Sequence, residues 1–123
     1  MKIRIRENTL RIRITQSELE KLGKGMSVKS SIHFPNGTLF SYGLQVGEMT
    51  NTTILFENNV IHISLGKLDI ETILEDTSVG IQSIHSTKAG ALDLLIEKDF
   101  TCLHPRDIED ADTFPNPNRN DNA

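Results

Sequence analysis

The side chains best suited to chemistry are basic residues near the start of the chain. They alternate with aliphatic residues in two short runs, and we call them the basic ladder: Lys2, Arg4, Arg6, Arg11 and Arg13. Guanidinium groups bind phosphate oxygens through two parallel hydrogen bonds. With Lys29 on a nearby predicted strand, the basic ladder is therefore our candidate anion-binding site. The alternative is a solvated strand face, on which basic residues keep a sheet edge from aggregating.

Carboxylates alternate in the same way near the end of the last predicted strand, at Asp93, Glu97 and Asp99. This spacing is compatible with magnesium held between the protein and substrate phosphates. We favour the alternative that these carboxylates pair with the arginines, because Leu95 interrupts the polar row. Opposite charges directly across neighbouring strands contribute roughly 0.2–1 kcal/mol per pair, so we expect the last strand to lie beside the first.

Cys102 and His104 put a thiol and an imidazole two residues apart. A structural zinc site usually has four ligands in paired spacings, and only this one pair occurs here. We therefore interpret both as ordinary residues and expect no cofactor, magnesium being the alternative. The single cysteine cannot form an internal disulfide, which favours a reducing, cytoplasmic location.

The elements that must position these side chains follow from periodicity. Residues 2–14 alternate with period two and predict two strands joined by a turn near residues 7–9. Thr15 and Glu18 have the spacing of a capping box, which predicts a helix start, and Gly23 and Gly25 predict its end. Strands over 26–34 and 38–44 flank a turn at 35–37. The first half therefore has the order β-β-α-β-β.

The same order recurs in the second half. It predicts strands over 53–56 and 60–65, a helix over 68–74, and strands over 79–85 and 91–98. A shift of 51 residues aligns identical residues, such as Ile12 with Ile63 and Glu20 with Glu71. We expect an α+β fold of two tandem β-β-α-β-β repeats, about 1–48 and 52–100. They would form a mainly antiparallel eight-stranded sheet, open or closed into a barrel, with two short helices.

Length and composition set the domain organisation. The chain has 123 residues and a formal net charge of −4. We expect a single domain over 1–104 and an acidic tail rich in Pro and Asn over 105–123, partly docked and disordered at its end. No run of apolar residues is long enough for a membrane helix. Tryptophan is absent and the net charge is negative, which disfavours nucleic acid as a partner.

Two segments carry a resemblance to a known family. They are LRIRITQSE at 10–18 and, near the other end, LLIEKDFTCLHPR at 94–106 with DADTFP at 110–115. The chain resembles a family of small uncharacterised bacterial proteins over about residues 1–117. The resemblance implies no activity, cofactor or catalytic residue. It does imply that the tail belongs to the protein and docks, with Phe114 in an apolar groove.

A similarity of architecture alone links the expected barrel to triphosphate-tunnel enzymes. The strand that would carry their metal-binding glutamates reads Lys2-Ile-Arg4-Ile-Arg6 here and lacks them. The catalytic residues stay unassigned, and we favour a non-catalytic protein that binds a small anion or another protein. The alternatives are a metal-dependent phosphohydrolase with Glu97 and Asp99 as ligands, and a homodimer formed through open sheet edges.

Overall fold

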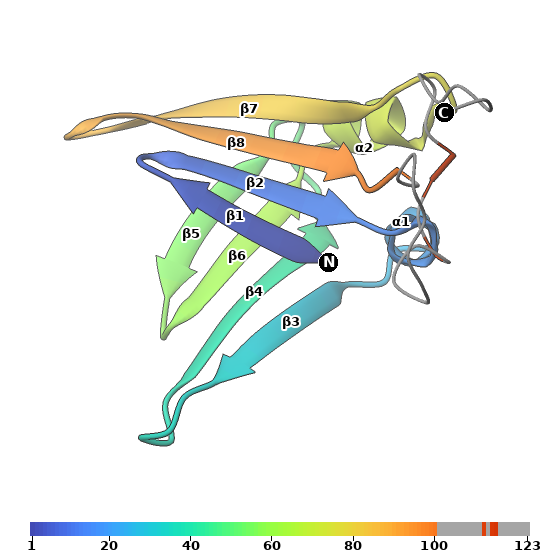
Figure 1. The fold of residues 1–123 in the computed structure, drawn as a ribbon. Helices are drawn as coiled ribbons and strands as arrows, with labels where there is room; N and C mark the ends of the chain where they lie inside the picture. Colours follow the sequence, from blue (N-terminus) through green and yellow to red (C-terminus); the bar gives the residue numbers. More distant parts are fainter. Residues whose placement is uncertain (101–111, 113, 116–123) are drawn as a thin grey trace, which may run out of the picture. The chain divides into compact units, whose positions relative to one another are not determined.

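The computed structural model describes residues 1–100, 112, 114 and 115 of the chain. In this part the elements follow the order β1 (Lys2–Arg6), β2 (Thr9–Ile14), α1 (Gln16–Gly23), β3 (Val28–His33), β4 (Leu39–Val46), β5 (Thr53–Glu57), β6 (Val60–Leu65), α2 (Lys67–Leu74), β7 (Gly80–Thr87) and β8 (Gly90–Lys98), as Figure 1 shows. Each of these elements was predicted from the sequence in type and order, with bounds that differ by a few residues at most. The α+β class is therefore confirmed.

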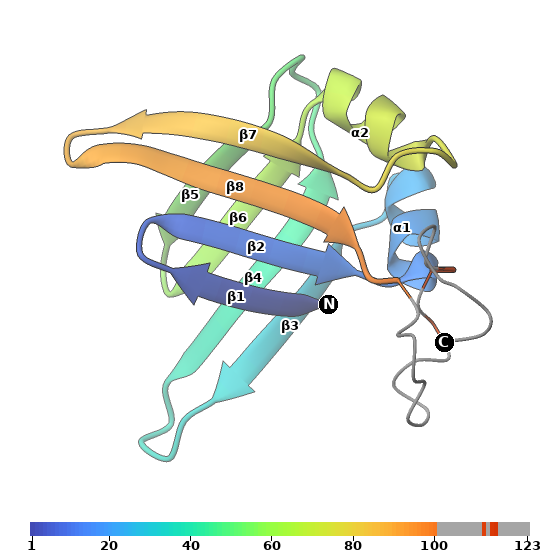
Figure 2. The same cartoon turned by 45° about the horizontal axis from the view of Figure 1, so that its top comes forward.

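The strands form two sheets of four. The first sheet has the order β1-β2-β8-β7 and the second has the order β3-β4-β6-β5. In each, two antiparallel hairpins are joined at the centre by a parallel pair, β2 with β8 and β4 with β6. Figure 2 shows β8 between β2 and β7 in the first sheet. The expectation of one eight-stranded sheet, or of a closed barrel, is therefore wrong, because each sheet ends in edge strands.

The expected pairing of the first and last strands is also wrong. Strand β8 pairs with β2, which lies between β8 and β1. Each sheet takes one hairpin from the first half of the chain and one from the second, so the pairing crosses the predicted repeats. The period-two pattern fixes which face of a strand is buried, but it carries no information about which hairpin will be its neighbour.

The first helix begins and ends as its sequence predicts. The backbone N–H of Thr15 donates to Glu18 at 2.9 Å, and the Thr15 hydroxyl accepts from the backbone N–H of Glu18 at 3.3 Å, forming the capping box. At the other end Gly25 has φ +81°, and the N–H of Met26 donates to the carbonyl of Lys21 at 2.9 Å. This is a Schellman motif, in which glycine takes the left-handed conformation without the Cβ penalty.

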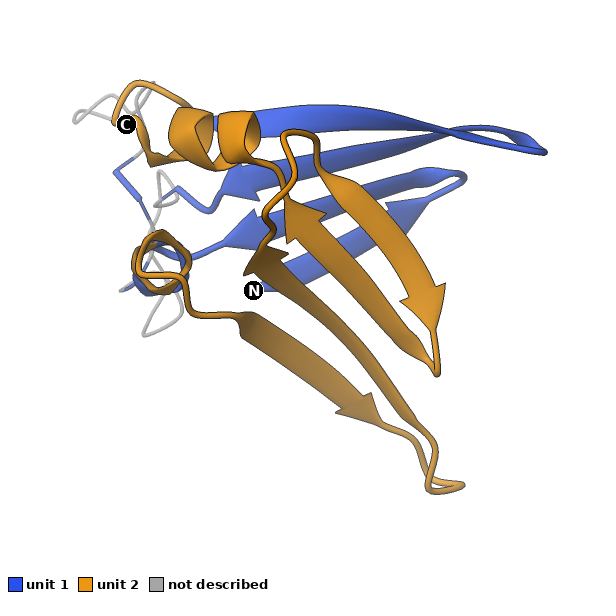
Figure 3. Cartoon of the chain, turned by 180° about the vertical axis from the view of Figure 1, so that it is seen from behind, with its two compact units in different colours: residues 1–19, 79–123 blue, residues 20–78 orange. Residues whose placement is uncertain are grey.

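Two compact units can be distinguished, as Figure 3 shows: residues 1–19 with 79–123, and residues 20–78. The first unit holds the first sheet, one face of which is buried through Leu10, Ile12, Ile14, Leu94 and Ile96. The second unit holds the second sheet, with Val28, Tyr42, Leu44, Ile61, Ile63 and Leu65 buried on the corresponding face. In both sheets, the polar residues that alternate with these apolar residues along the strands lie on the opposite face.

Phe114 of the tail contacts the end of β8 and the residues that follow it. The backbone N–H of Phe114 donates to the carbonyl of Asp99 at 2.6 Å, and the Phe114 ring lies edge-on to Phe100 with centroids 5.7 Å apart. The Lys98 ammonium lies 5.2 Å from the centre of the Phe114 ring.

Among the described residues, neither helix has the length and apolar character that crossing a membrane would require.

Candidate anion-binding face

The hairpin of β1 and β2 brings the whole basic ladder onto one face of the first sheet. Its antiparallel register places Lys2 opposite Arg13, Arg4 opposite Arg11, and Arg6 opposite Thr9. Directly opposite residues point to the same face, so the five basic side chains form two columns and three rows. Arg11 is half-buried and the other four are exposed. The register thus joins the two basic runs, which the sequence pattern left as separate strands.

Two rows of this arrangement are like-charge pairs. Lys2 faces Arg13 and Arg4 faces Arg11 across the hairpin, although like charges directly opposite each other destabilise a sheet. Within the part of the chain that the structure describes, Arg4, Arg6 and Arg13 form no ion pair. Three guanidinium groups therefore present their N–H donors to solvent, next to other positive charges.

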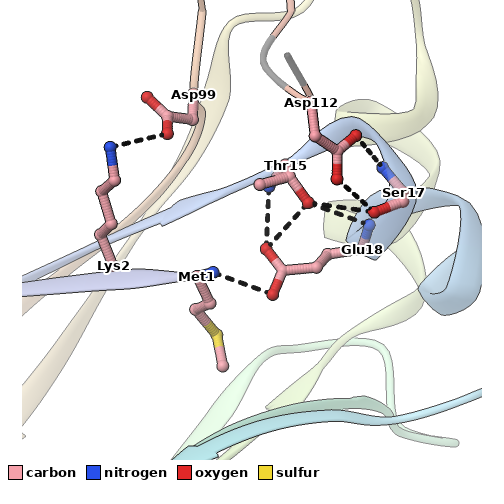
Figure 4. A network of polar contacts seen from close by, with 7 residues as sticks. All are labelled: Met1, Lys2, Thr15, Ser17, Glu18, Asp99 and Asp112. Carbon is pink, nitrogen blue, oxygen red and sulfur yellow. Dashed lines mark hydrogen bonds and ion pairs between the residues drawn. The ribbon is translucent and has the colours of Figure 1, made fainter. Parts of the chain in front are cut away.

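Two ladder residues do have acidic partners. The Lys2 ammonium lies 3.3 Å from Asp99, whose side chain is only 10% exposed (Figure 4), and Arg11 Nε lies 3.2 Å from Glu97. Because Glu97 contacts Nε, the four N–H donors on the terminal nitrogens of Arg11 stay available to a ligand. Glu97 thus positions Arg11 without occupying its whole guanidinium group.

The face is hollowed at two neighbouring places. One hollow, of about 240 Å³, is lined by Arg4, Arg6, Thr9 and Arg11. The second, of about 190 Å³, is lined by Lys2, Ile3, Arg4, Arg11 and Arg13. Both hollows share the central pair of Arg4 and Arg11. Thr9 adds a hydroxyl that sequence reasoning missed, because its place opposite Arg6 follows only from the register.

The predicted carboxylates lie beside the ladder and each has its own partner. The parallel register of β2 and β8 places Asp93 beside Thr9 and Glu97 beside Arg13, on the ladder's face. Gln82 donates to Asp93 at 2.8 Å, while Glu97 and Asp99 take the ion pairs described above. Among the described residues, no three His, Cys, Asp or Glu side chains are grouped so that they could hold a metal ion.

The remaining candidates lie elsewhere. Lys29 is on β3 in the second sheet and is therefore not on the face that carries the ladder. There it lines a hollow of about 110 Å³ with Gly43, Gln45 and His62 among its neighbours. Cys102 and His104 lie outside the described residues.

A polar network at the start of α1 adjoins the Lys2 end of the ladder (Figure 4). Glu18 accepts from Thr15 and from the amino group of Met1, the latter at 2.9 Å. Asp112 accepts from the Ser17 hydroxyl and, at 3.1 Å, from the Ser17 backbone N–H. The Ser17 hydroxyl lowers the pKa of the Asp112 carboxyl; burial opposes that shift, and the Ser17 backbone N–H reinforces it. Asp112 is therefore a charged cap on the first turn of the helix.

Comparison with known proteins gives a family and no activity. No curated protein and no solved structure matches the chain. The profile of one family matches residues 1–118, which is almost the whole chain, and that family is described as one of unknown function. The chain accordingly belongs to the family of unknown function DUF7009.

Proposed function

We propose that this protein is a non-catalytic binding protein that holds a phosphate-bearing anion on the basic ladder. The observation that carries the proposal is the pair of Arg4 and Arg11, two opposed guanidinium groups between two hollows. Like charges in this position destabilise the free sheet, and an anion between them reverses the sign of that interaction. Arginine also offers the planar fork that matches phosphate oxygens.

The second sheet argues against a merely protective role for the ladder. It has the same arrangement of hairpins and the same parallel central pair, so its positions can be matched to those of the first sheet. At the positions that match Arg4 and Arg11 it carries Leu55 and His62, and at those of Lys2 and Arg13 it carries Thr53 and Ser64. A sheet of this topology therefore forms without arginines on that face.

The arrangement favours binding over metal-dependent hydrolysis. Each of the three predicted metal ligands is already engaged, Asp93 by Gln82, Glu97 by Arg11 and Asp99 by Lys2. Glu97 would have to leave Arg11 in order to bind a magnesium ion, which would remove the contact that positions the central arginine. The carboxylates therefore act as partners of the ladder.

A duplication of the β-β-α-β-β unit accounts for the matched sheets. A shift of 51 residues turns β1 and β2 into β5 and β6, and one contact of each helix follows the same shift. Glu18 on α1 accepts from Met1, while Asp69 on α2 accepts from the hydroxyl of Thr52. In this interpretation, the basic ladder is a feature of only one of the two duplicated units.

A thermal-shift experiment tests the proposed function. The wild type, the variant Arg4→Ala/Arg11→Ala and the control Lys29→Ala are compared in inorganic phosphate and in sodium chloride of equal ionic strength. An anion at 100 times its dissociation constant adds about 2.7 kcal/mol, which raises Tm by several degrees. We expect this rise in the wild type and the control, and its loss in the double variant. Equal behaviour of all three proteins would show that the ladder is not the site.

A further inference from the structure

The spacing of the ladder restricts the kind of anion that it fits. Side chains on one face of a strand repeat about every 6.7 Å, because a strand rises about 3.3 to 3.4 Å per residue. Opposite residues on β1 and β2 are closer, with Cβ atoms about 5 Å apart. The rows Lys2 with Arg13, Arg4 with Arg11, and Arg6 with Thr9 therefore form steps of about 7 Å along the hairpin.

The two hollows lie between successive rows. The row of Arg4 and Arg11 lines both, Arg6 and Thr9 line only the first, and Lys2 and Arg13 line only the second. Each hollow therefore has at least three basic side chains, and the two centres are separated by one step of the ladder, about 7 Å. Adjacent phosphates in pyrophosphate share a bridging oxygen and lie much closer together than this.

Acidic side chains bound the patch along its β8 side and at its Lys2 end. On the side of β8, Asp93 lies beside Thr9, and Glu97 lies beside Arg13. The ladder covers two strands and three rows, and at the Lys2 end it meets Asp99. A polyanion that continued past the Lys2 end would approach Asp99, which repels it. The surface suits a small ligand with two phosphates.

Resting on the proposed function, we infer that the ligand is a small bisphosphate whose two phosphate groups are separated by a carbon skeleton. One phosphate occupies the hollow of Arg4, Arg6, Thr9 and Arg11, and the other occupies the hollow that reaches Lys2 and Arg13. The central arginines contact both groups. A hexose phosphorylated at both ends has the chemistry of this ligand class.

Isothermal titration calorimetry at low ionic strength distinguishes a ligand with two separated phosphates from other phosphate-bearing anions. The probes are fructose 1,6-bisphosphate, fructose 6-phosphate, pyrophosphate and a short oligothymidylate. Two linked groups that each fill one hollow act as a bivalent ligand, so we expect the bisphosphate to bind at least about tenfold more tightly than the monophosphate or pyrophosphate. Pyrophosphate is the control for charge, because it carries a high charge but its two phosphate groups are not separated by a carbon skeleton.

Single variants at the two ends test the division into two hollows. Arg6→Ala removes a residue of the first hollow only, and Arg13→Ala removes a residue of the second only. Each should reduce bisphosphate affinity to about that of the monophosphate, and Lys29→Ala should leave it unchanged. Both arginines are exposed and without an ion pair among the described residues, so neither variant should lower the Tm.

The possible outcomes separate a failure of this inference from a failure of the proposed function on which it rests. Pyrophosphate binding as tight as bisphosphate binding would overturn the two-phosphate inference and leave the anion site in place. Tighter binding of the oligothymidylate would also overturn it, in favour of a phosphodiester chain. No binding of any probe by the wild-type protein would reject both.

Discussion

At the scale of single residues, Arg4 and Arg11 form a like-charge pair at the centre of the basic ladder. They face each other across β1 and β2, and among the described residues only Arg11 has a carboxylate within reach, Glu97 at 3.2 Å. Neutralising a charge that serves ligand binding should stabilise the ligand-free protein, whereas neutralising a charge that serves the fold should destabilise it. The ligand-free protein therefore offers a test that needs no knowledge of the ligand.

We predict that Arg4→Gln stabilises the ligand-free protein while it weakens phosphate binding. Removal of one charge from the like-charge pair should raise the free energy of unfolding by about 0.2–1 kcal/mol. The gain should shrink in high salt, where exposed charges are screened. Urea denaturation at two salt concentrations measures it, with Lys29→Gln as the matched control. A loss of stability in Arg4→Gln would identify Arg4 as a structural residue.

Asp112 gives a prediction about pH. Its pKa is lowered chiefly by the Ser17 hydroxyl, so the folded state favours the charged carboxylate. Its stabilising contribution is present above the unfolded pKa of about 3.9 and is lost as the pH falls through the lower folded value. Asp112→Asn should therefore be less stable than the wild type at pH 7, and the difference should shrink as the pH falls below the unfolded pKa of Asp112. Chemical denaturation across this range measures it, and a difference that does not change with pH would contradict the assignment.

The sequence predicted the candidate residues better than it predicted their partners. The ladder was evident from alternation, and its grouping on one face is confirmed by the register. Thr9 was missed because an isolated hydroxyl gives no signal until its neighbours are known. Lys29 was grouped with the ladder because the sequence did not reveal that β3 belongs to a different sheet.

At the scale of elements, the hairpin of β1 and β2 carries a strained turn next to the ladder. Glu7 has φ 50°, a left-handed conformation that side chains other than Asn, Asp and Gly rarely adopt. The matching hairpin of β5 and β6 has Asn58 at φ 54° in the same place. The two turns therefore differ in how well their residues suit the backbone.

We predict that Glu7→Asn stabilises the protein by up to about 1 kcal/mol, because asparagine adopts the left-handed region at lower cost. The reciprocal change Asn58→Glu should destabilise it by a similar amount, and it serves as the matched control. Thermal unfolding of both variants measures the two effects. A fall in Tm for Glu7→Asn would contradict the interpretation and give the Glu7 carboxylate a stabilising role.

Local signals in the sequence specified the elements well. The capping box of Thr15 and Glu18 and the glycine at position 25 marked the limits of α1, because these contacts lie within a few residues of one another. Alternation marked the strands for the same reason. The parallel pairs β2 with β8 and β4 with β6 were not predicted, since they join segments far apart in the chain and leave no local pattern.

At the scale of the whole molecule, neither half of the chain contains a complete sheet. The first sheet needs β1 and β2 from the first half together with β7 and β8 from the second. The second sheet likewise combines β3 and β4 with β5 and β6. An isolated hairpin is marginally stable at best in water, so each half depends on the other.

We predict that neither fragment 1–50 nor fragment 51–115 folds as a monomer. Mixing them should restore the strand signal in circular dichroism and a cooperative thermal transition, because the central parallel pairs can form only then. Circular dichroism combined with analytical ultracentrifugation makes the measurement. A monomeric fragment that unfolds cooperatively by itself would show that the halves are independent and that the sheets are not shared between them.

The most direct test of the basic ladder as an anion-binding face is a titration of the ¹⁵N-labelled protein with inorganic phosphate, followed by amide and arginine Nε–Hε chemical shifts. We expect saturable shifts confined to β1, β2 and the neighbouring part of β8, largest at Arg4 and Arg11, with little change on β3 at Lys29. Shifts spread evenly over exposed basic residues, or centred on the second sheet, would contradict it.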